Sequence, residues 1–207
     1  YSFSDASKAS ILSRFFKTGV GEYGEGDVFI GVSIPQLRSI ARNNRDIDLS
    51  IVKELLKRKE HEIRMCALLI LTYKYKKGKD EEKKDIFEMY IDNIKYINNW
   101  DLVDLTAPNI VGEFLKDKNR SLLYTLAKSN NLWERRISIL STFTFLRNND
   151  HIDTLKISKI LLQDPHDLIH KAVGWMLREV YKRDPKIIRE FLNEFAATMP
   201  RTMLRYA

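Results

Sequence analysis

One short segment of the chain combines an indole ring with a carboxylate at helical spacing. Trp100 and Asp104 stand four residues apart, so a helix would place both side chains on one face, about one turn apart. A carboxylate near a helix start is favoured in its ionised form by the helix dipole. Such a group can stabilise a developing positive charge or orient a water molecule. The structural alternative is a core tryptophan beside a capping aspartate.

A second cluster places an indole between two cations. Lys171 precedes Trp175 by four residues and Arg178 follows it by three, so one helix face would carry all three side chains. An aromatic ring flanked by cations suits a sugar or base with a phosphate on either side. Gly174 would let a facing helix or a ligand approach closely. The alternative is a buried tryptophan whose basic neighbours extend along the surface.

Both clusters belong to a repeat. Five similar segments follow turn signals and open the second helix of a pair; their anchor residues are Arg64, Asp104, Arg136, Lys171 and Arg205. The anchors lie 32 to 40 residues apart, a period typical of stacked helix pairs of the HEAT kind. In such a stack the anchors would form a row of cations, interrupted by one carboxylate, that matches a phosphate backbone. Alternatively, each cation pairs with an acid of the neighbouring repeat.

The elements that must position these residues are all expected to be helices. Only 8 glycines and 5 prolines occur in 207 residues, and Val-rich alternating runs are absent. The expected helical ranges are 5–17, 35 onward, 48–58, 61–77, 80–96, 100–116, 119–128, 132–147, 152–162, 166–183, 185–195 and 201 onward. We expect one domain over residues 1–207, an α-solenoid of antiparallel helix pairs with a concave basic face, whose C-terminal helix is cut short.

Composition restricts the class of protein. A hydrophobic share of 44% favours a folded core over disorder. The single cysteine, Cys66, excludes an intrachain disulfide and favours a reducing, cytoplasmic compartment. Neither a secretory leader nor an apolar run of about 18 residues is visible, so no membrane association is expected. The net charge of +7 is compatible with a polyanionic partner.

Two motif matches do not predict chemistry. Residues 19–24 fit the G-x-G-x-x-G pattern of a dinucleotide-binding loop, but no strand precedes them and nearby acids would repel a pyrophosphate. His166 and His170 have the spacing of a metal pair, but a zincin glutamate and a third ligand are missing. We therefore expect no metal and no other cofactor. The role of the glycine-rich stretch 19–27 stays open.

Several segments together resemble the AlkD-type alkylpurine DNA glycosylases. These segments are Phe29–Pro35, Trp100–Leu105, Leu132–Arg136, Ile169–Arg178 and Arg201–Ala207. The resemblance covers nearly the whole chain. It implies a HEAT-like-repeat enzyme that excises positively charged N3- and N7-alkylated purines from duplex DNA without flipping the base.

The resemblance also implies roles for individual residues. Asp104 would be the catalytic carboxylate, Trp100 and Trp175 the aromatics beside the deoxyribose of the lesion, and Arg136 the basic partner across the cleft. The expected DNA contacts are Arg64, Lys171, Arg178, Arg205, Phe15 and Phe16. The two phenylalanines are the best matches to a family aromatic on the first helix that is usually a tyrosine.

The residue types fit this chemistry independently. Hydrolysis of an N-glycosidic bond passes through an oxocarbenium-like sugar, which a single carboxylate can stabilise. An alkylated purine already carries positive charge and leaves without a proton from a second carboxyl group. The expected partner is double-stranded DNA carrying alkylated purines, bound by a monomer without an obligatory protein partner.

Two other functions fit the same charge pattern. A non-catalytic HEAT-repeat module would bind damaged or branched DNA, and the phenylalanine on the first helix is compatible with it. A protein-binding solenoid would use the charged row for an acidic partner. The glycosylase and the DNA-binding module would both lose affinity for DNA steeply as the salt concentration rises, whereas the protein-binding solenoid would show no such dependence.

Overall fold

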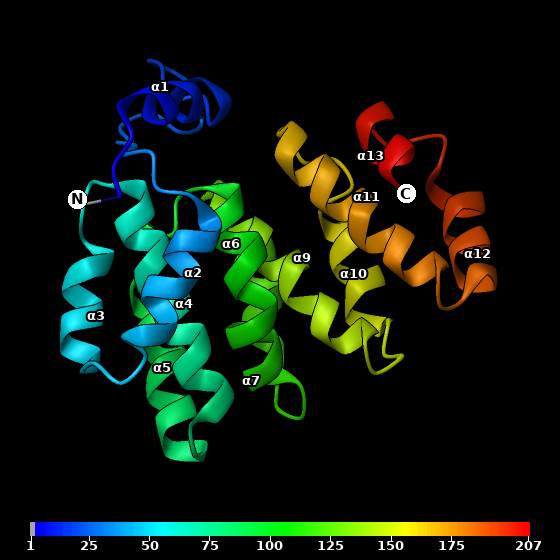
Figure 1. The fold of residues 1–207 in the computed structure, drawn as a ribbon. Coiled ribbons are helices and arrows are strands. Elements are labelled where there is room, and N and C mark those ends of the chain that lie inside the picture. Colours follow the sequence, from blue (N-terminus) through cyan, green and yellow to red (C-terminus); the bar gives the residue numbers. More distant parts are fainter. Residues whose placement is uncertain (1–2) are drawn as a thin grey trace. The chain divides into compact units, whose positions relative to one another are not determined.

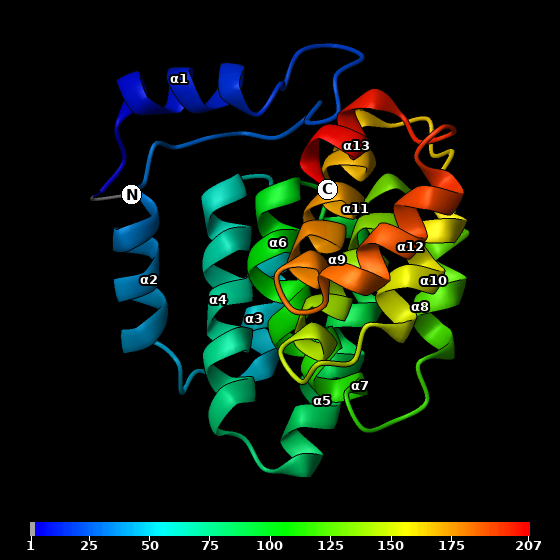
Figure 2. The same cartoon turned by 90° about the vertical axis from the view of Figure 1, so that its right-hand side faces the viewer.

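The computed structural model describes residues 3–207, and the regular secondary structure in this range is helical (Figures 1 and 2). An isolated bridge pairs Val28 with Glu60. The helices belong to two compact units, residues 1–102 and 103–207, and the boundary lies inside helix α6 (Trp100–Ala107). The all-helical prediction is confirmed, whereas the single domain over residues 1–207 stays a prediction.

The first unit is built around α4. Its helices are α1 (Ala6–Phe15), α2 (Ile34–Asn43), α3 (Leu49–Leu56), α4 (His61–Lys77), α5 (Asp80–Asp92) and the 3-10 helix η1 (Ile94–Tyr96). Helix α4 packs against α2, α3 and α5, and most of its residues are buried as a result. Its apolar positions therefore surround the helix instead of forming one stripe, as expected of a central helix.

Helix α1 differs from the others because none of its residues is buried. It lies apart from α2–α5 at one end of the unit (Figures 1 and 2). Its start is attached where the backbone N–H of Asp5 donates to the carbonyl of Ile30 at 3.0 Å. A Cβ at Gly31, where φ is +81°, would collide with the Asp5 carbonyl. The other end is attached by Phe16, whose side chain is buried.

The second unit consists of stacked helix pairs. Its helices are α8 (Ser121–Ala127), α9 (Leu132–Leu146), α10 (Ile152–Ile160), α11 (Asp167–Tyr181), α12 (Pro185–Phe195) and α13 (Arg201–Tyr206). Helix α11 packs against both α9 and α13. Helices α8 and α10 pack against α9, and α10 also packs against α11. The predicted pairing of helices is thus present in this unit.

The anchor residues keep a common register in these helices. Asp104, Arg136, Lys171 and Arg205 each occupy the fifth position of their helix, and Arg64 occupies the fourth position of α4. The repeat found in the sequence therefore corresponds to a repeat in structure, with each anchor one turn inside its helix.

The predicted helix over 100–116 is interrupted. Helix α6 passes into a π-helical segment, η2 (Pro108–Gly112), which leads into the short helix α7 (Glu113–Leu115). Pro108 lacks the N–H that an α-helix needs at this point, which explains the change in helical geometry. The hydroxyl of Thr144 on α9 donates to the Pro108 carbonyl at 2.6 Å, which ties this segment to α9.

Membrane-spanning character is not found in the described part of the chain. No helix within residues 3–207 combines the length and apolar character needed to cross a bilayer.

Candidate active site

A bidentate ion pair joins Asp104 to Arg136 in the second unit. Nε and Nη2 of Arg136 donate to Oδ1 and Oδ2 of Asp104, both at 2.7 Å. Two parallel charge-assisted hydrogen bonds fix the plane of the carboxylate as well as its position. The Asp104 side chain keeps 18% of its surface exposed and that of Arg136 keeps 6%. The Asp104 side chain is therefore partly exposed, whereas that of Arg136 is buried.

Helix α9 holds Arg136 in this orientation. The side chain of Asn131 caps the helix by accepting from the N–H of Trp133 at 2.8 Å, and the Trp133 ring is buried. Nη1 of Arg136 donates to the carbonyl of Leu168 at 2.5 Å, which ties the guanidinium to the first turn of α11. Asp104 is thus held beside the start of the helix that carries the second aromatic cluster.

The second cluster lies on α11. The Trp175 ring is half-buried, tilted by 47° against Phe143 with ring centroids 5.8 Å apart, and its side chain also forms a hydrogen bond with Glu179. The Lys171 ammonium pairs with Asp167 one turn earlier at 2.6 Å, with both side chains largely in solvent. Trp175 is consequently oriented by packing, whereas Lys171 is held only by an ion pair that is open to solvent and therefore weak.

Two further exposed cations lie on α11 and α13, which pack against each other. The Arg205 side chain is exposed, and the guanidinium of Arg178 on α11 lies over the Tyr206 ring at 5.9 Å. The close packing predicted at Gly174 is present, because a Cβ there would lie 2.5 Å from the carbonyl oxygen of Met203. Lys171, Arg178 and Arg205 are therefore the accessible cations among the predicted DNA contacts.

The predicted aromatics of the first unit form a stack. Phe16 lies between Phe29 and Trp100, with ring centroids 4.9 and 5.0 Å away and interplanar angles of 19° and 16°. Phe15 meets the Trp100 ring edge-on at 5.9 Å and is 61% exposed. Of the two candidates, Phe15 therefore has the accessible ring, and Phe16 supports Trp100 from within. Trp100 stands one helical turn before Asp104 on α6.

The prediction that Arg64 contacts DNA does not fit its position. The residue is 4% exposed, and its guanidinium donates to the carbonyls of Arg58, Lys59 and Tyr96. It also donates to Asn98 and forms an ion pair with Asp27. The repeat places this anchor correctly on its helix, but neighbouring chain covers it, so Arg64 cross-links the interior of the first unit.

Sequence reasoning missed a buried histidine in the first unit. His61 is bound through Nδ1 to Asp27 and through Nε2 to Asp101, both at 2.9 Å. Burial by itself would lower the pKa of His61, but its hydrogen bonds to Asp101 and Asp27 outweigh that effect and raise it to about 9. No sequence motif predicts that His61 contacts these two aspartates, because 40 residues separate it from Asp101 and 34 separate it from Asp27.

The two rejected motifs have structural explanations. In the glycine-rich stretch, the carboxylates of Glu22 and Glu25 accept from the backbone N–H groups of Gly19 and Gly21, which fold the loop on itself. His166 accepts from the N–H of Leu168 at the start of α11, and His170 contacts the carbonyl of Asp164. Both histidines thus help to begin α11.

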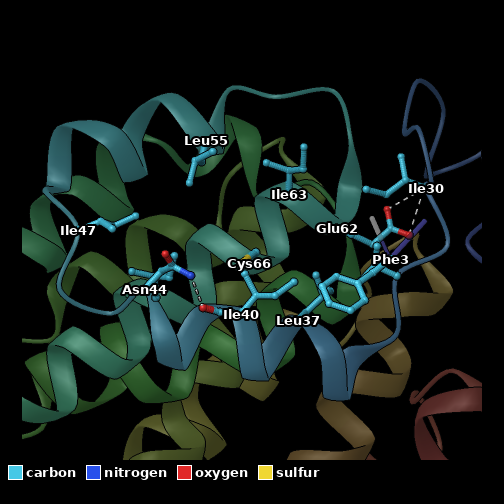
Figure 3. Close-up of a pocket in the computed structure, with 12 residues that line it drawn as sticks. Phe3, Ile30, Leu37, Ile40, Asn44, Ile47, Leu55, Glu62, Ile63 and Cys66 are labelled. Atoms are coloured by element: carbon cyan, nitrogen blue, oxygen red, sulfur yellow. Dashed lines mark hydrogen bonds between the residues drawn. The ribbon is translucent and has the colours of Figure 1, made fainter. Parts of the chain in front are cut away.

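A separate cavity of about 330 Å³ lies among α2, α3 and α4 (Figure 3). Its lining is largely apolar and includes Leu37, Leu55 and the partly buried Cys66, whose thiol pKa is raised by burial. Figure 3 shows the Glu62 carboxylate at its edge, directed at the backbone of Ile30. The Glu62 carboxylate is thus used for structure, because it accepts from the backbone of the segment beside the cavity.

Comparisons with known proteins agree with this assignment of fold. The model of a family described as "DNA alkylation repair enzyme" matches residues 1–207. A solved structure described as a predicted DNA alkylation repair enzyme from Enterococcus faecalis is 17% identical, with a TM-score of 0.73 over 98% of this chain and 94% of that chain. A search of curated proteins found no match.

Two further solved structures, both from Streptococcus mutans, have a similar fold. The protein smu.31 of strain UA159 is 19% identical with a TM-score of 0.58, and AlkD2 is 18% identical with a TM-score of 0.57. Each alignment covers 97% of this chain and 94% of the other. At these identities the structural likeness establishes the fold alone.

Proposed function

The chain belongs to the DNA alkylation repair enzyme family, and from this premise we propose that it is a DNA glycosylase. Its substrate would be duplex DNA carrying purines alkylated at N3 or N7, and its reaction the hydrolysis of the N-glycosidic bond. The observation that carries the proposal is the partly exposed Asp104 side chain, whose carboxylate is held in a fixed plane by Arg136.

In the proposed reaction Asp104 stabilises the sugar. As the bond to the cationic purine breaks, positive charge moves onto the deoxyribose, and a preoriented carboxylate is worth most at that moment. The purine leaves neutral, so no acid is needed to protonate it. A water molecule then adds to the sugar carbon, with its proton transferred to solvent or to the carboxylate.

Arg136 has two tasks in this proposal. It keeps Asp104 in place before substrate arrives, and its charge attracts the phosphate next to the lesion. Because the Asp104 side chain is the more exposed member of the pair, the sugar would approach the carboxylate and not the buried guanidinium. The ion pair thus prevents the carboxylate from sitting unpaired in the resting protein.

The two indoles would contact the sugar of the lesion. Cation–π attraction between an indole face and an oxocarbenium-like ring contributes about 0.5–2 kcal/mol, and it favours the transition state because the charge develops there. Trp100 is supported for this task by Phe16, and Trp175 by Phe143. Lys171, Arg178 and Arg205 would bind backbone phosphates, and Phe15 would lie against the duplex.

The proposed site selects by the charge of the leaving group. Many glycosylases read a base by flipping it into a deep pocket, whereas this proposal uses only groups that face the sugar and the phosphates. We therefore expect cationic purines with different alkyl groups to be released, and uncharged lesions of similar size to be spared.

The test is Asp104→Asn in a single-turnover assay of N7-methylguanine release from duplex DNA. We expect the rate to fall about 10²- to 10³-fold while affinity for undamaged duplex is kept. Asp117→Asn is the matched control, because Asp117 is an exposed carboxylate of the same unit and its loss changes net charge equally. Full excision by Asp104→Asn would exclude Asp104 as the catalytic carboxylate.

A non-catalytic DNA-binding module is the second candidate, and the aromatic on the first helix favours it. Phe15 presents a ring without a hydroxyl at the accessible position. Prolonged incubation with alkylated plasmid, followed by a search for abasic sites, separates the two functions. Absence of abasic sites, together with salt-dependent duplex binding, would favour the binding module.

A further inference from the structure

We propose that His61 is a positioning residue, which as an imidazolium fastens residues 17–31 to the start of α6 and thereby fixes the Phe16–Trp100 stack. Residues 17–31, which contain the glycine-rich stretch, are called the strap. The catalytic consequence rests on the proposed function, but the structural role of His61 does not.

The hydrogen bonds of His61 require both ring nitrogens to donate. Nδ1 and Nε2 each face a carboxylate oxygen at 2.9 Å, one from Asp27 and one from Asp101. A neutral imidazole has a single N–H, so its other ring nitrogen would direct a lone pair at a carboxylate oxygen in a place that is nearly closed to water. The exposed side-chain fractions are 3% for His61, 2% for Asp27 and 10% for Asp101.

Charge is balanced within this cluster. Asp27 also pairs with Arg64 and accepts from the side-chain amide of Asn99 at 3.0 Å. Two carboxylates therefore face two cations, which is the condition under which buried charges are tolerated. His61 is the cation of this cluster whose charge changes under mildly alkaline conditions, because its pKa is raised to about 9.

The first turn of α4 forms several hydrogen bonds with the strap. The N–H of His61 donates to the carbonyl of Val28 at 2.8 Å. The neighbouring Glu62 accepts from the N–H groups of Ile30 and Gly31 at 3.0 and 2.8 Å, as Figure 3 shows for Ile30. A glycine-rich segment loses much conformational entropy on ordering, so these contacts are needed to hold it.

The strap in turn holds the aromatic stack. The His61 ring lies on Phe29 with centroids 4.4 Å apart and is 5.2 Å from Phe16. Phe16 lies between the end of α1 and the start of the strap, and its ring stacks on Trp100. Asp101, the second hydrogen-bond partner of His61, directly follows Trp100 on α6. His61 thus contacts both the rings that support Trp100 and the helix turn that carries it.

The experiment uses His61→Gln and Asp101→Asn in the full chain. Hydrogen exchange of residues 17–31 reports the strap, and acrylamide quenching of Trp100 reports the stack in a background where Trp133 and Trp175 are replaced by Phe. We expect ~10-fold faster strap exchange and at least about twofold stronger quenching in His61→Gln, with smaller effects in Asp101→Asn, which keeps the bond to Asp27.

Val52→Ala is the matched control. Val52 is a fully buried residue of α3, so its truncation destabilises the same unit without touching the cluster. Equal changes in strap exchange and quenching in Val52→Ala and His61→Gln would overturn the proposal, since general destabilisation would then explain both. Unchanged exchange and quenching in His61→Gln would overturn it as well.

A pH series on the wild type provides a readout that needs no substitution. Strap protection, corrected for the intrinsic exchange rate, should be complete below about pH 6.5 and decline as pH rises to about 9, the folded pKa of His61. Protection that persists unchanged to pH 10 would contradict the proposed imidazolium. His61→Gln, if it folds, should lack this step.

The link to catalysis is tested separately. With N7-methylguanine duplex, His61→Gln should lower the single-turnover rate ~10-fold while the Kd for undamaged duplex changes less than about twofold. If no form of the protein, wild type included, releases alkylpurine, the glycosylase proposal fails. The exchange and quenching results still decide the role of His61, because neither measurement uses damaged DNA.

Discussion

At the scale of single residues, the Asp104–Arg136 pair depends on the shape of its cation. A guanidinium donates to both carboxylate oxygens at once, whereas an ammonium is a point charge that fixes neither the plane nor the distance of its partner. Arg136 also donates a third hydrogen bond, to the Leu168 carbonyl, and a lysine ammonium in its place would lose this bond as well. The pair therefore needs arginine and not simply positive charge.

Arg136→Lys should accordingly impair both stability and excision. We expect a loss of about 1–3 kcal/mol in the free energy of unfolding, because Asp104 and the Leu168 carbonyl lose donors. The single-turnover rate should fall about 10-fold or more. Urea denaturation and the excision assay measure the two effects, and wild-type values in both would show that charge alone suffices at this position.

The charge of His61 makes folding stability depend on pH. Its folded pKa of about 9 lies above the ordinary 6.5, so its stabilisation is complete below about pH 6.5 and is lost as pH rises to about 9. On the acid side, burial would raise the pKa of Asp27, but His61, Arg64 and Asn99 lower it. That contribution is present above the ordinary 3.8 and disappears as pH falls through the lowered pKa.

We therefore expect the free energy of unfolding to drop between pH 6.5 and 9 by an amount on the order of 3 kcal/mol. Urea denaturation at a series of pH values measures it. His61→Gln should lack this drop, so the difference between the two curves isolates the histidine. Parallel curves for the two proteins would show that His61 does not titrate in this window.

At the scale of helices, the contact between α11 and α13 depends on a missing side chain. A Cβ at Gly174 would lie 2.5 Å from the Met203 carbonyl oxygen, which is backbone and cannot rotate away. Alanine favours a helix over glycine by about 1 kcal/mol, but the collision displaces α13 as a whole. The net effect of Gly174→Ala should therefore be unfavourable.

We expect Gly174→Ala to cost about 1–3 kcal/mol in unfolding free energy and to speed hydrogen exchange in residues 201–206. DNA affinity should fall as well, because α13 carries Arg205. Calorimetry and exchange mass spectrometry measure the first two effects. A more stable variant would mean that helix propensity outweighs the collision.

The helices themselves were largely predictable. Periodic apolar residues and breakers gave α4 and α12 with their observed ends, since a strong local pattern decides where a helix begins and stops. The range 80–96 divides into α5 and η1, and the range 100–116 contains η2. Pro108 was visible in the sequence, but the hydrogen bond from Thr144 to its carbonyl joins segments 36 residues apart and could not be predicted from local pattern.

The positions of the candidate residues on their helices were predictable where the repeat carried them. A common register placed Asp104, Arg136 and Lys171 on equivalent turns, because a repeat transfers position from one helix pair to the next. The same logic was wrong for the surroundings of Arg64, since burial depends on segments outside the repeat. His61 was missed for the same reason: its partners come from a loop and from another helix.

At the scale of the whole molecule, the accessible cations predict how DNA affinity depends on salt. Each phosphate contact that is lost should lower the slope of log affinity against log salt by about 0.9. Lys171→Ala, Arg178→Ala and Arg205→Ala should each show this reduction. Lys156→Ala, an exposed lysine on α10, is the control and should leave the slope unchanged. Unaltered slopes in all the variants would place the DNA elsewhere.

Temperature should affect the parts of the chain unequally, because α1 buries none of its ten residues. A helix of this length is marginal in water by itself, so it depends on its attachments at Asp5 and Phe16 and on the contact of Phe15 with Trp100. Warming would release those attachments while α4 still holds its core together. Thermal inactivation should then precede global melting, and cooling from that intermediate range should restore the lost activity without refolding the remainder.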